Sequence, residues 1–275
     1  MTIGAYLSAP ALITPGIEDW ATAVASLKGE REYQSSDLEK YKPNLLPPNE
    51  RRRATAMIRL AFHAGEQTLA QSSYNAEQLA SVFASSGGDD DIVDQICMTL
   101  LQADRPVSPI QFHNSVHNSA SGYWSIATKS HHLSQSVSAG RATFIEGLTE
   151  AMVLVALENQ PVLFIVYEQP APEAMFIGRQ VEQPFAASFI LSSEAPVNSL
   201  SKISLFTSEE VTGKAEKDRV ESVCDNQGLE RLRLSSPAAR SLPLLQAIVN
   251  DQTADLCFKN AGKRNVVLHC EPANA

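Results

Sequence analysis

The stretch that decides the fold is SPIQFHNSVHNSASGYWSIATKSHHLSQSVSAGRATFIEGLTEA, residues 108–151. It begins with a turn at Ser108-Pro109, passes through a polar segment rich in histidine and asparagine, and has the spacing of a helix over residues 118–129. A short strand, a turn of small residues and a second helix follow. A strand, a tight turn and a helix together are a common mount for a nucleophile, because the turn exposes a side chain at the helix N-terminus.

Apolar runs on both sides of this stretch predict a sheet. Three of them have the length and composition of buried strands, at residues 79–84 (LASVFA), 161–167 (PVLFIVY) and 184–191 (PFAASFIL). A first strand is expected over residues 2–8, ended by Pro10. Helices are expected between the strands, one from Pro48 to about Ala70 and one after the acidic run Asp89-Asp90-Asp91. This alternation predicts an α/β fold with a mostly parallel sheet and helices on both faces.

The C-terminal part of the sequence is less regular. Residues 192–237 are polar and have no clear periodicity. A helix at 238–250 and strands at 254–259 and 265–270 are expected to finish the chain, either on the same sheet or as a short second layer.

Composition excludes several classes of function. The chain has 275 residues, 44% of them apolar, which is enough for a sizeable core. Its net charge of -9 argues against a nucleic-acid binder, and the one dense basic run, Arg51-Arg52-Arg53, is expected on a solvated helix face. Its four cysteines are far apart and predict free thiols in a reducing compartment. No basic leader and no membrane span is apparent, so we expect a cytoplasmic protein.

One candidate site emerges from the residues alone. Ser136-Val137-Ser138-Ala139-Gly140 is close to the G-x-S-x-G elbow of serine hydrolases, with serine in place of the first glycine. A serine hydrolase or acyltransferase would use Ser138 with Asp251 or Asp255 and with His269. His113 and His117 lack a carboxylate or cysteine in ligand spacing, so neither a metal site nor a cofactor is predicted.

The same stretch also resembles the N-terminal half of the β-ketoacyl-ACP synthases, which have the thiolase fold. The residues that match are Ser108-Pro109, Phe112, Ser115-Val116-His117-Asn118, Gly122 and the turn at 136–142. The resemblance covers residues 1–195. It implies a thiolase-like half, with a mixed, mostly parallel five-stranded sheet and helices on both faces. The second half would be truncated to a shortened appendage, residues 196–275, that packs on the same core.

Two departures from the family remove the catalytic residues. Counting forward from Asn118 without a gap, the position of the family's nucleophilic cysteine falls on Arg141. A guanidinium is permanently protonated and cannot form an acyl thioester. The two histidine motifs of the family's second half are also absent from the sequence. We therefore expect no catalytic residue and no activity of the chain alone.

A ketosynthase-like chain without nucleophile and histidines resembles a chain-length factor, the non-catalytic subunit that pairs with a true ketosynthase in type II polyketide systems. The HNSVHN and GYWSIAT segments are similar to those of the shortened form used in aryl polyene biosynthesis. A stand-alone thiolase-fold binding protein is a further alternative, and it predicts a stable homodimer.

The resemblance assigns roles to residues within the opening stretch. It implies a partner interface made by Leu133, Ser134, Gln135, Ser136, Val137, Ser138 and Arg141. It implies a lining of the partner's acyl tunnel made by Phe112, His113, Asn114, Val116, His117, Asn118 and Phe144. Tyr123 and Trp124 are bulky candidates for which core packing is an equal alternative.

Two further expectations concern the partners. Arg141 would either meet a partner carboxylate or fill the vestigial pocket while anchored by carbonyl groups. An acyl carrier protein is acidic, so it should dock mainly on the ketosynthase, with Arg51, Arg52, Arg53 and Arg59 as this chain's contribution.

Overall fold

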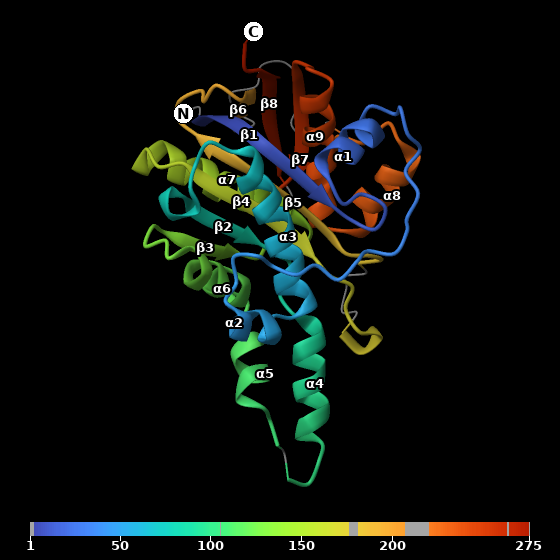
Figure 1. Ribbon diagram of the computed structural model, residues 1–275. Helices are drawn as coiled ribbons and strands as arrows, with labels where there is room; N and C mark the ends of the chain where they lie inside the picture. Colours follow the sequence, from blue (N-terminus) through green and yellow to red (C-terminus); the bar gives the residue numbers. More distant parts are fainter. Residues whose placement is uncertain (1–2, 105, 176–180, 207–219, 263, 275) are drawn as a thin grey trace.

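One mixed sheet runs through the whole body of the molecule (Figure 1). A computed structural model describes residues 3–104, 106–175, 181–206, 220–262 and 264–274. Within these residues the sheet has eight strands in the order β3-β2-β4-β5-β1-β6-β8-β7. The strands are β1 (Ile3–Ile13), β2 (Ala80–Ala84), β3 (Ser134–Val137), β4 (Val162–Glu168), β5 (Phe185–Ser192), β6 (Ser199–Phe206), β7 (Ala254–Lys259) and β8 (Asn265–Pro272).

Helices cover both faces of this sheet. They are α1 (Trp20–Leu27), α2 (Pro48–Arg53), α3 (Ala56–Gln71), α4 (Asp90–Leu100), α5 (Pro109–Asn114), α6 (Ser119–Thr128), α7 (Thr143–Glu158), α8 (Gln227–Ser235) and α9 (Leu242–Val249). Short 3-10 turns include η2 (Gly140–Ala142) and η5 (Ala238–Ser241). The predicted α/β class is confirmed.

The strand directions differ from the prediction of a mostly parallel, five-stranded sheet. Only β2 pairs in parallel, with β3 on one side and β4 on the other, and the remaining neighbours among the described strands are antiparallel. The continuous apolar runs suggested parallel strands because those are buried on both faces. Here β4 and β5 are fully buried although they are antiparallel, since helices cover the sheet on both sides.

The two faces of the sheet carry two separate cores. Alternate residues of β4 point to opposite faces, so Val162, Phe164 and Val166 join one cluster, whereas Leu163, Ile165 and Tyr167 join the other. Helices α1, α7, α8 and α9 cover the first cluster, and α3 and α6 cover the second.

Close packing on the second face depends on a glycine of α3. A Cβ atom on Gly65 would lie 2.8 Å from the indole of Trp124 and 2.9 Å from the Ile165 side chain. The indole is itself almost fully buried against Phe62 and Phe83. Tyr123 and Trp124 are therefore core residues, which was one of the two alternatives for them.

Strand β1 continues through Pro10, where the sequence predicted its end. Its pairing with β5 shifts register between Ser8 and Ala11, and Ala9 has a positive φ of 51°. A proline is tolerated in a strand at such a bulge, because the ladder is already interrupted there.

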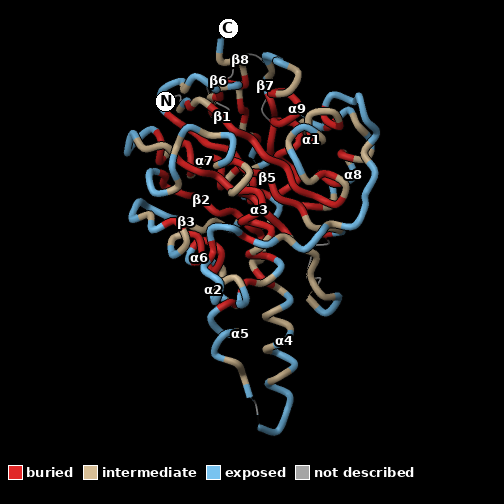
Figure 2. The backbone as a smooth tube through the Cα atoms, viewed as in Figure 1, coloured by how far each residue is buried: buried red, intermediate tan, exposed pale blue. Residues whose placement is uncertain are grey.

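Helices α4 and α5 form a hairpin that projects from the body, and we call it the arm (Figure 1). Figure 2 shows that much of the arm is exposed, in contrast to the buried sheet. Its base is tied to the body by Asn114, whose side-chain amide donates to the main-chain oxygen of Arg53 at 3.0 Å.

The C-terminal part contributes more regular structure than its sequence suggested. Strand β6 and helix α8 lie in the stretch that was expected to be irregular. Strand β6 pairs with β1 and with β8, so β6, β8 and β7 continue the same sheet and form no second layer. The division into domains at residue 195 stays a prediction.

Candidate functional site

The predicted strand, turn and helix are present at the start of α7. Strand β3 leads into the turn η2, where Gly140 adopts a left-handed φ of 55°. The hydroxyl of Thr143 donates to the main-chain oxygen of Gly140 at 2.7 Å and accepts from the Ala139 amide at 3.0 Å. These two hydrogen bonds close the turn and fix the residues at the helix N-terminus.

Arg141 lies on this turn with its side chain exposed. Its guanidinium donates to the main-chain oxygen of Leu234 in the last turn of α8, at 3.3 Å from each terminal nitrogen. Carbonyl oxygens near a helix C-terminus carry partial negative charge, so a cation is stabilised there. Of the two expectations for Arg141, the structure contains the contact with a carbonyl group.

A second arginine lies close to Arg141. Arg240 is buried and forms an ion pair with Glu221. Burial, and to a lesser degree the charge of Arg141, lowers the pKa of Arg240 to about 10. Even so, Arg240 stays protonated at neutral pH, where the carboxylate of Glu221 balances its charge.

The serine-hydrolase alternative does not hold in the structure. His269 and Asp255 do form an acid–histidine pair, with 2.8 Å between Nδ1 and Oδ1, on the adjacent strands β8 and β7. Ser138, however, follows β3 at the opposite end of the sheet, six strand spacings away. At about 4.8 Å per spacing this is roughly 25–30 Å, so no triad can form. The Ser138 hydroxyl instead donates to the main-chain oxygen of Ser86 at 3.0 Å.

Strand β3 forms one edge of the sheet, and its main-chain N–H and C=O groups on the side away from β2 pair with no described strand. The main-chain oxygens of Leu133 and Val137 accept from Ser81 and Ser85 at 2.9 and 3.1 Å. Because a strand alternates, the main-chain groups of Ser134 and Ser136 point away from β2. Their side chains bond within the chain: the Ser134 hydroxyl accepts from that of Ser81 at 2.8 Å, and the Ser136 hydroxyl lies 3.0 Å from that of Ser121.

The opposite edge, β7, is covered. The amide of Ser222 donates to the main-chain oxygen of Cys257 at 2.9 Å, and the Cys257 amide donates back to the Ser222 hydroxyl at 2.9 Å. The amide of Lys259 donates to a carboxylate oxygen of Glu221 at 3.1 Å. Proteins usually protect edge strands against unwanted pairing. Among the described residues no strand pairs with the outer side of β3, which indicates an interaction surface.

The residues predicted to line a tunnel lie at the arm and its base. Phe112 on α5 has 66% of its surface exposed, and Val116 is also exposed. His113 lies edge-on to Tyr123 with 5.7 Å between ring centroids. The ring of His117 contacts the main-chain oxygen of Ser85 at 2.8 Å through Nε2. Asn118 is exposed just before α6.

Two of the predicted tunnel residues have a structural role instead. Asn114 is buried, and besides its contact with Arg53 it accepts from the Tyr123 hydroxyl at 3.1 Å. Phe144 is fully buried on α7, with ring centroids 6.2 Å from Phe164 and 5.4 Å from Phe258. The prediction that Phe144 lines a tunnel is corrected accordingly, because its side chain has no surface from which to face another chain.

Sequence reasoning assigned Phe112 and Val116 to a contact surface but missed the rest of the exposed apolar surface of the arm. Leu101 is 79% exposed, and other apolar side chains share this exposure: Met98, Leu100, Ile110, Phe112 and Val116. Ile92, Val93 and Ile96 are half-buried nearer the body, and Leu100 continues their face of α4. Exposed apolar side chains gathered on one projecting hairpin indicate a contact with another surface, and the apolar residues after Ile96 carried this signal.

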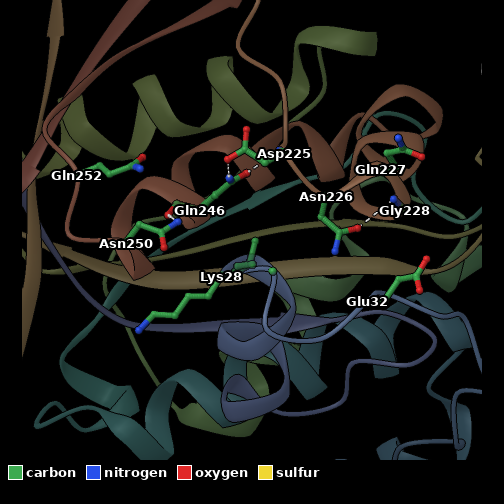
Figure 3. A pocket seen from close by; sticks show the side chains of 11 residues that line it. Lys28, Glu32, Asp225, Asn226, Gln227, Gly228, Gln246, Asn250 and Gln252 are labelled. Atoms are coloured by element: carbon green, nitrogen blue, oxygen red, sulfur yellow. Dashed lines mark hydrogen bonds between the residues drawn. The ribbon is translucent and has the colours of Figure 1, made fainter.

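A polar cavity of about 500 Å³ lies between the end of α1 and helices α8 and α9 (Figure 3). Several of its side chains are already paired. Gln246 contacts both the amide and the carboxylate of Asp225, and Asn226 accepts from the Gly228 amide at 3.0 Å. The lining contains Lys28, Glu32 and Asp225 but no histidine, cysteine or serine, so it lacks the pair of a hydroxyl or thiol nucleophile and an imidazole base.

No group of three or more His, Cys, Asp or Glu side chains in the described part of the chain has the arrangement of a metal site. None of the helices among the described residues is long and apolar enough to cross a membrane.

Comparison with known proteins gives the family. Residues 26–242 match the model of the β-ketoacyl synthase N-terminal domain, which is most of the chain, and the protein belongs to this family. No curated protein matches the sequence.

Solved structures share the whole fold at low sequence identity. A chain of a ketosynthase (ApeO) in complex with its chain length factor (ApeC) from Xenorhabdus doucetiae is 22% identical, with a TM-score of 0.67 over 96% of this chain and 98% of that one. A chain of the ishigamide ketosynthase/chain length factor is 13% identical, with a TM-score of 0.69 over 98% and 99%. The fold is therefore thiolase-like, and its similarity to these structures extends over nearly their full length.

Proposed function

We propose that this protein is a non-catalytic chain-length factor that pairs with a catalytic ketosynthase and shapes the acyl tunnel of that partner. The observation that carries the proposal is Arg141, an exposed arginine held on an otherwise intact strand–turn–helix mount. A condensing enzyme needs a thiolate at this place, and an arginine cannot be acylated there. Two structural relatives are described as ketosynthase and chain-length-factor assemblies, which supports the same role.

The open edge of β3 is the proposed centre of the interface. In the family, the strand before the nucleophile pairs antiparallel with the corresponding strand of the second subunit. The outward main-chain groups of Ser134 and Ser136 are suited to this pairing, with Leu133, Gln135, Val137, Ser138 and Arg141 flanking it. A shared ladder adds main-chain hydrogen bonds and fixes the register of the two subunits.

The arm is the proposed contact with the partner's tunnel. Its exposed apolar side chains gain free energy when another chain covers them, at about 25 cal/mol per Å² of apolar surface removed from water. Phe112 and Val116 would close the tunnel, with His113, His117 and Asn118 at its wall. A tunnel of fixed shape limits product length, because each added two-carbon unit beyond its capacity meets a steric cost.

The finer assignments are also proposals. The HNSVHN and GYWSIAT segments favour aryl polyene biosynthesis, and we place the complex in the cytoplasm. An acyl carrier protein would dock mainly on the ketosynthase. On this chain only Arg52 and Arg53 are exposed on α2, whereas the half-buried Arg59 guanidinium already donates to three main-chain oxygens of its own chain.

Co-expression with a ketosynthase that has its cysteine and both histidines tests the proposal. We expect a stable heteromer, condensation of malonyl units only when both chains are present, and no activity of this chain alone. Decarboxylation of malonyl carrier protein by this chain alone, or its failure to associate with any such ketosynthase, would contradict the proposal. Labelling of Ser138 by a fluorophosphonate would also contradict it.

A further inference from the structure

A second cavity lies on the face of the sheet that α3 covers. It has a volume of about 520 Å³ and is enclosed between α3 and a strap, residues 31–47, that connects α1 to α2 without helix or strand. Pockets of this size take small organic molecules.

The strap is fastened on both sides of this cavity. On one side, the Tyr33 hydroxyl donates to the main-chain oxygen of Pro15 at 2.9 Å, and the Ser35 hydroxyl donates to Gln183 at 2.8 Å. On the other side, the Tyr41 hydroxyl donates to a carboxylate oxygen of Glu66 at 2.6 Å. Because both ends are held, the space beneath the intervening residues is a fixed feature of the fold.

One wall of the cavity contains the guanidinium of Arg59, which main-chain oxygens hold in place. Arg59 donates from Nε to the main-chain oxygen of Ala54 at 3.0 Å and from one terminal nitrogen to that of Tyr41 at 3.1 Å. Its other terminal nitrogen donates to the main-chain oxygen of Arg51. A guanidinium has five N–H groups, so two remain. Among the described residues no carboxylate forms an ion pair with Arg59, and its charge is compensated only by carbonyl dipoles.

The other walls are apolar or uncharged. Leu38, Ala54, Leu60 and Pro184 contribute apolar surface. His63 is buried and stacks on Tyr41, with ring centroids 4.0 Å apart and planes within 4°. Glu39 and Lys40, which also line the cavity, are both exposed. Their charges are opposite, so together they add no net charge that would attract or repel an anion.

We propose that this cavity binds a small amphipathic carboxylate, with the carboxylate on the free N–H groups of Arg59 and the apolar part between the strap and α3. A planar guanidinium fork matches a carboxylate better than any other common anion of that size, and the apolar walls exclude strongly hydrated inorganic anions. The inference does not depend on the proposed pairing with a ketosynthase, and its test uses this chain without a partner.

Octanoate is a suitable probe, and its binding to the full chain can be followed by saturation-transfer NMR and titration calorimetry. We expect saturable binding. Ala56 is exposed at the start of α3 and lines the cavity, so Ala56→Trp should abolish binding by filling the space without disturbing the core. Arg59→Gln should weaken binding about tenfold or more, the usual effect of losing a charged hydrogen bond.

Arg52→Gln is the matched control, because it removes the same charge from the exposed face of α2 outside the cavity and should leave octanoate binding unchanged. Octylammonium has the same apolar chain and the opposite charge, and it should bind at least about tenfold more weakly. The proposal is overturned if octanoate does not saturate at millimolar concentration, if Ala56→Trp binds it normally, or if octylammonium binds equally well. Ala56→Trp leaves the carbonyl contacts of Arg59 in place, so it remains decisive even if Arg59→Gln does not fold.

Discussion

Both terminal nitrogens of Arg141 donate to the main-chain oxygen of Leu234, which joins the start of α7 to the end of α8. By the proposal above, this contact lies at the position of the family's nucleophile. The turn between β3 and α7 can therefore be retained in a chain without a nucleophile, because Arg141 gives this turn a structural role.

Arg141→Cys is therefore expected to leave the chain inactive. The substitution restores a thiol at the start of a helix, yet the family's two histidine motifs are still missing from the sequence. The melting temperature should change by only a few degrees, because the lost hydrogen bonds are exposed. Release of labelled carbon dioxide from malonyl carrier protein by the purified variant is the measurement, and release above background would refute the prediction.

Ser136→Pro is expected to prevent association with the ketosynthase and to preserve the fold of the single chain. The main-chain N–H of Ser136 points away from β2, so proline removes a donor only from the free edge. Co-purification of the two chains from a common lysate measures the effect.

Ser136→Ala is the control for this experiment, because it keeps the N–H and removes the hydroxyl contact with Ser121. If both variants lose the partner, the hydroxyl and not the strand edge is responsible. If the proline variant still co-purifies, β3 is not the interface.

Phe112→Ala in the assembled complex is expected to lengthen the product. Phe112 is the most exposed aromatic side chain of the arm, and its removal enlarges any cavity that it closes. Mass spectrometry of the carrier-bound products measures the chain length.

Phe144→Leu is the contrasting variant. Phe144 is packed between Phe164 and Phe258 in the core, so its truncation should lower the melting temperature by several degrees and leave the product length unchanged. The opposite outcome, an altered product from Phe144→Leu and a normal one from Phe112→Ala, would place the tunnel on the other face of the chain.

His63 gives a prediction about pH. Burial lowers the pKa of its imidazole to about 4, whereas the unfolded chain binds a proton near pH 6.5. The stability that the neutral ring contributes is complete above pH 6.5 and is lost as the pH falls towards 4, by at most about 1.4 kcal/mol per pH unit. Melting temperatures across this window measure the slope.

His63→Gln should flatten this slope relative to the wild type, and the exposed His132→Gln should not. An identical pH dependence in all three proteins would show that the buried imidazole titrates normally.

The sequence predicted those parts of the fold where local signals agree with the final environment. The apolar runs of β2, β4 and β5 and the turn at Gly140 are correctly placed, because their burial follows directly from composition. Strand β6 was missed because its serines hide the alternation of Ile203 and Leu205. Phe144 was misplaced because a residue in the first turn of a helix can face either the core or a partner, and only the neighbouring strands decide which.

Of the candidate site, Arg141 was predictable from the sequence, whereas the exposure of the strand edges was not. Arg141 stands out against the family pattern because its side chain cannot carry out the chemistry. The open edge of β3 and the covered edge of β7 depend instead on segments far apart in the sequence, such as Ser222 beside Cys257. Nothing local in either strand indicates whether another segment will cover it.

The difference between the two edges also sets the size of any assembly built through β3. A sheet with two open edges can add subunits without limit and grow into a filament. Here Glu221 and Ser222 occupy main-chain groups of β7, so among the described strands β3 is the edge left for a second chain in the proposed assembly. In that proposed assembly the sheet would be extended once, and growth would end at a closed pair.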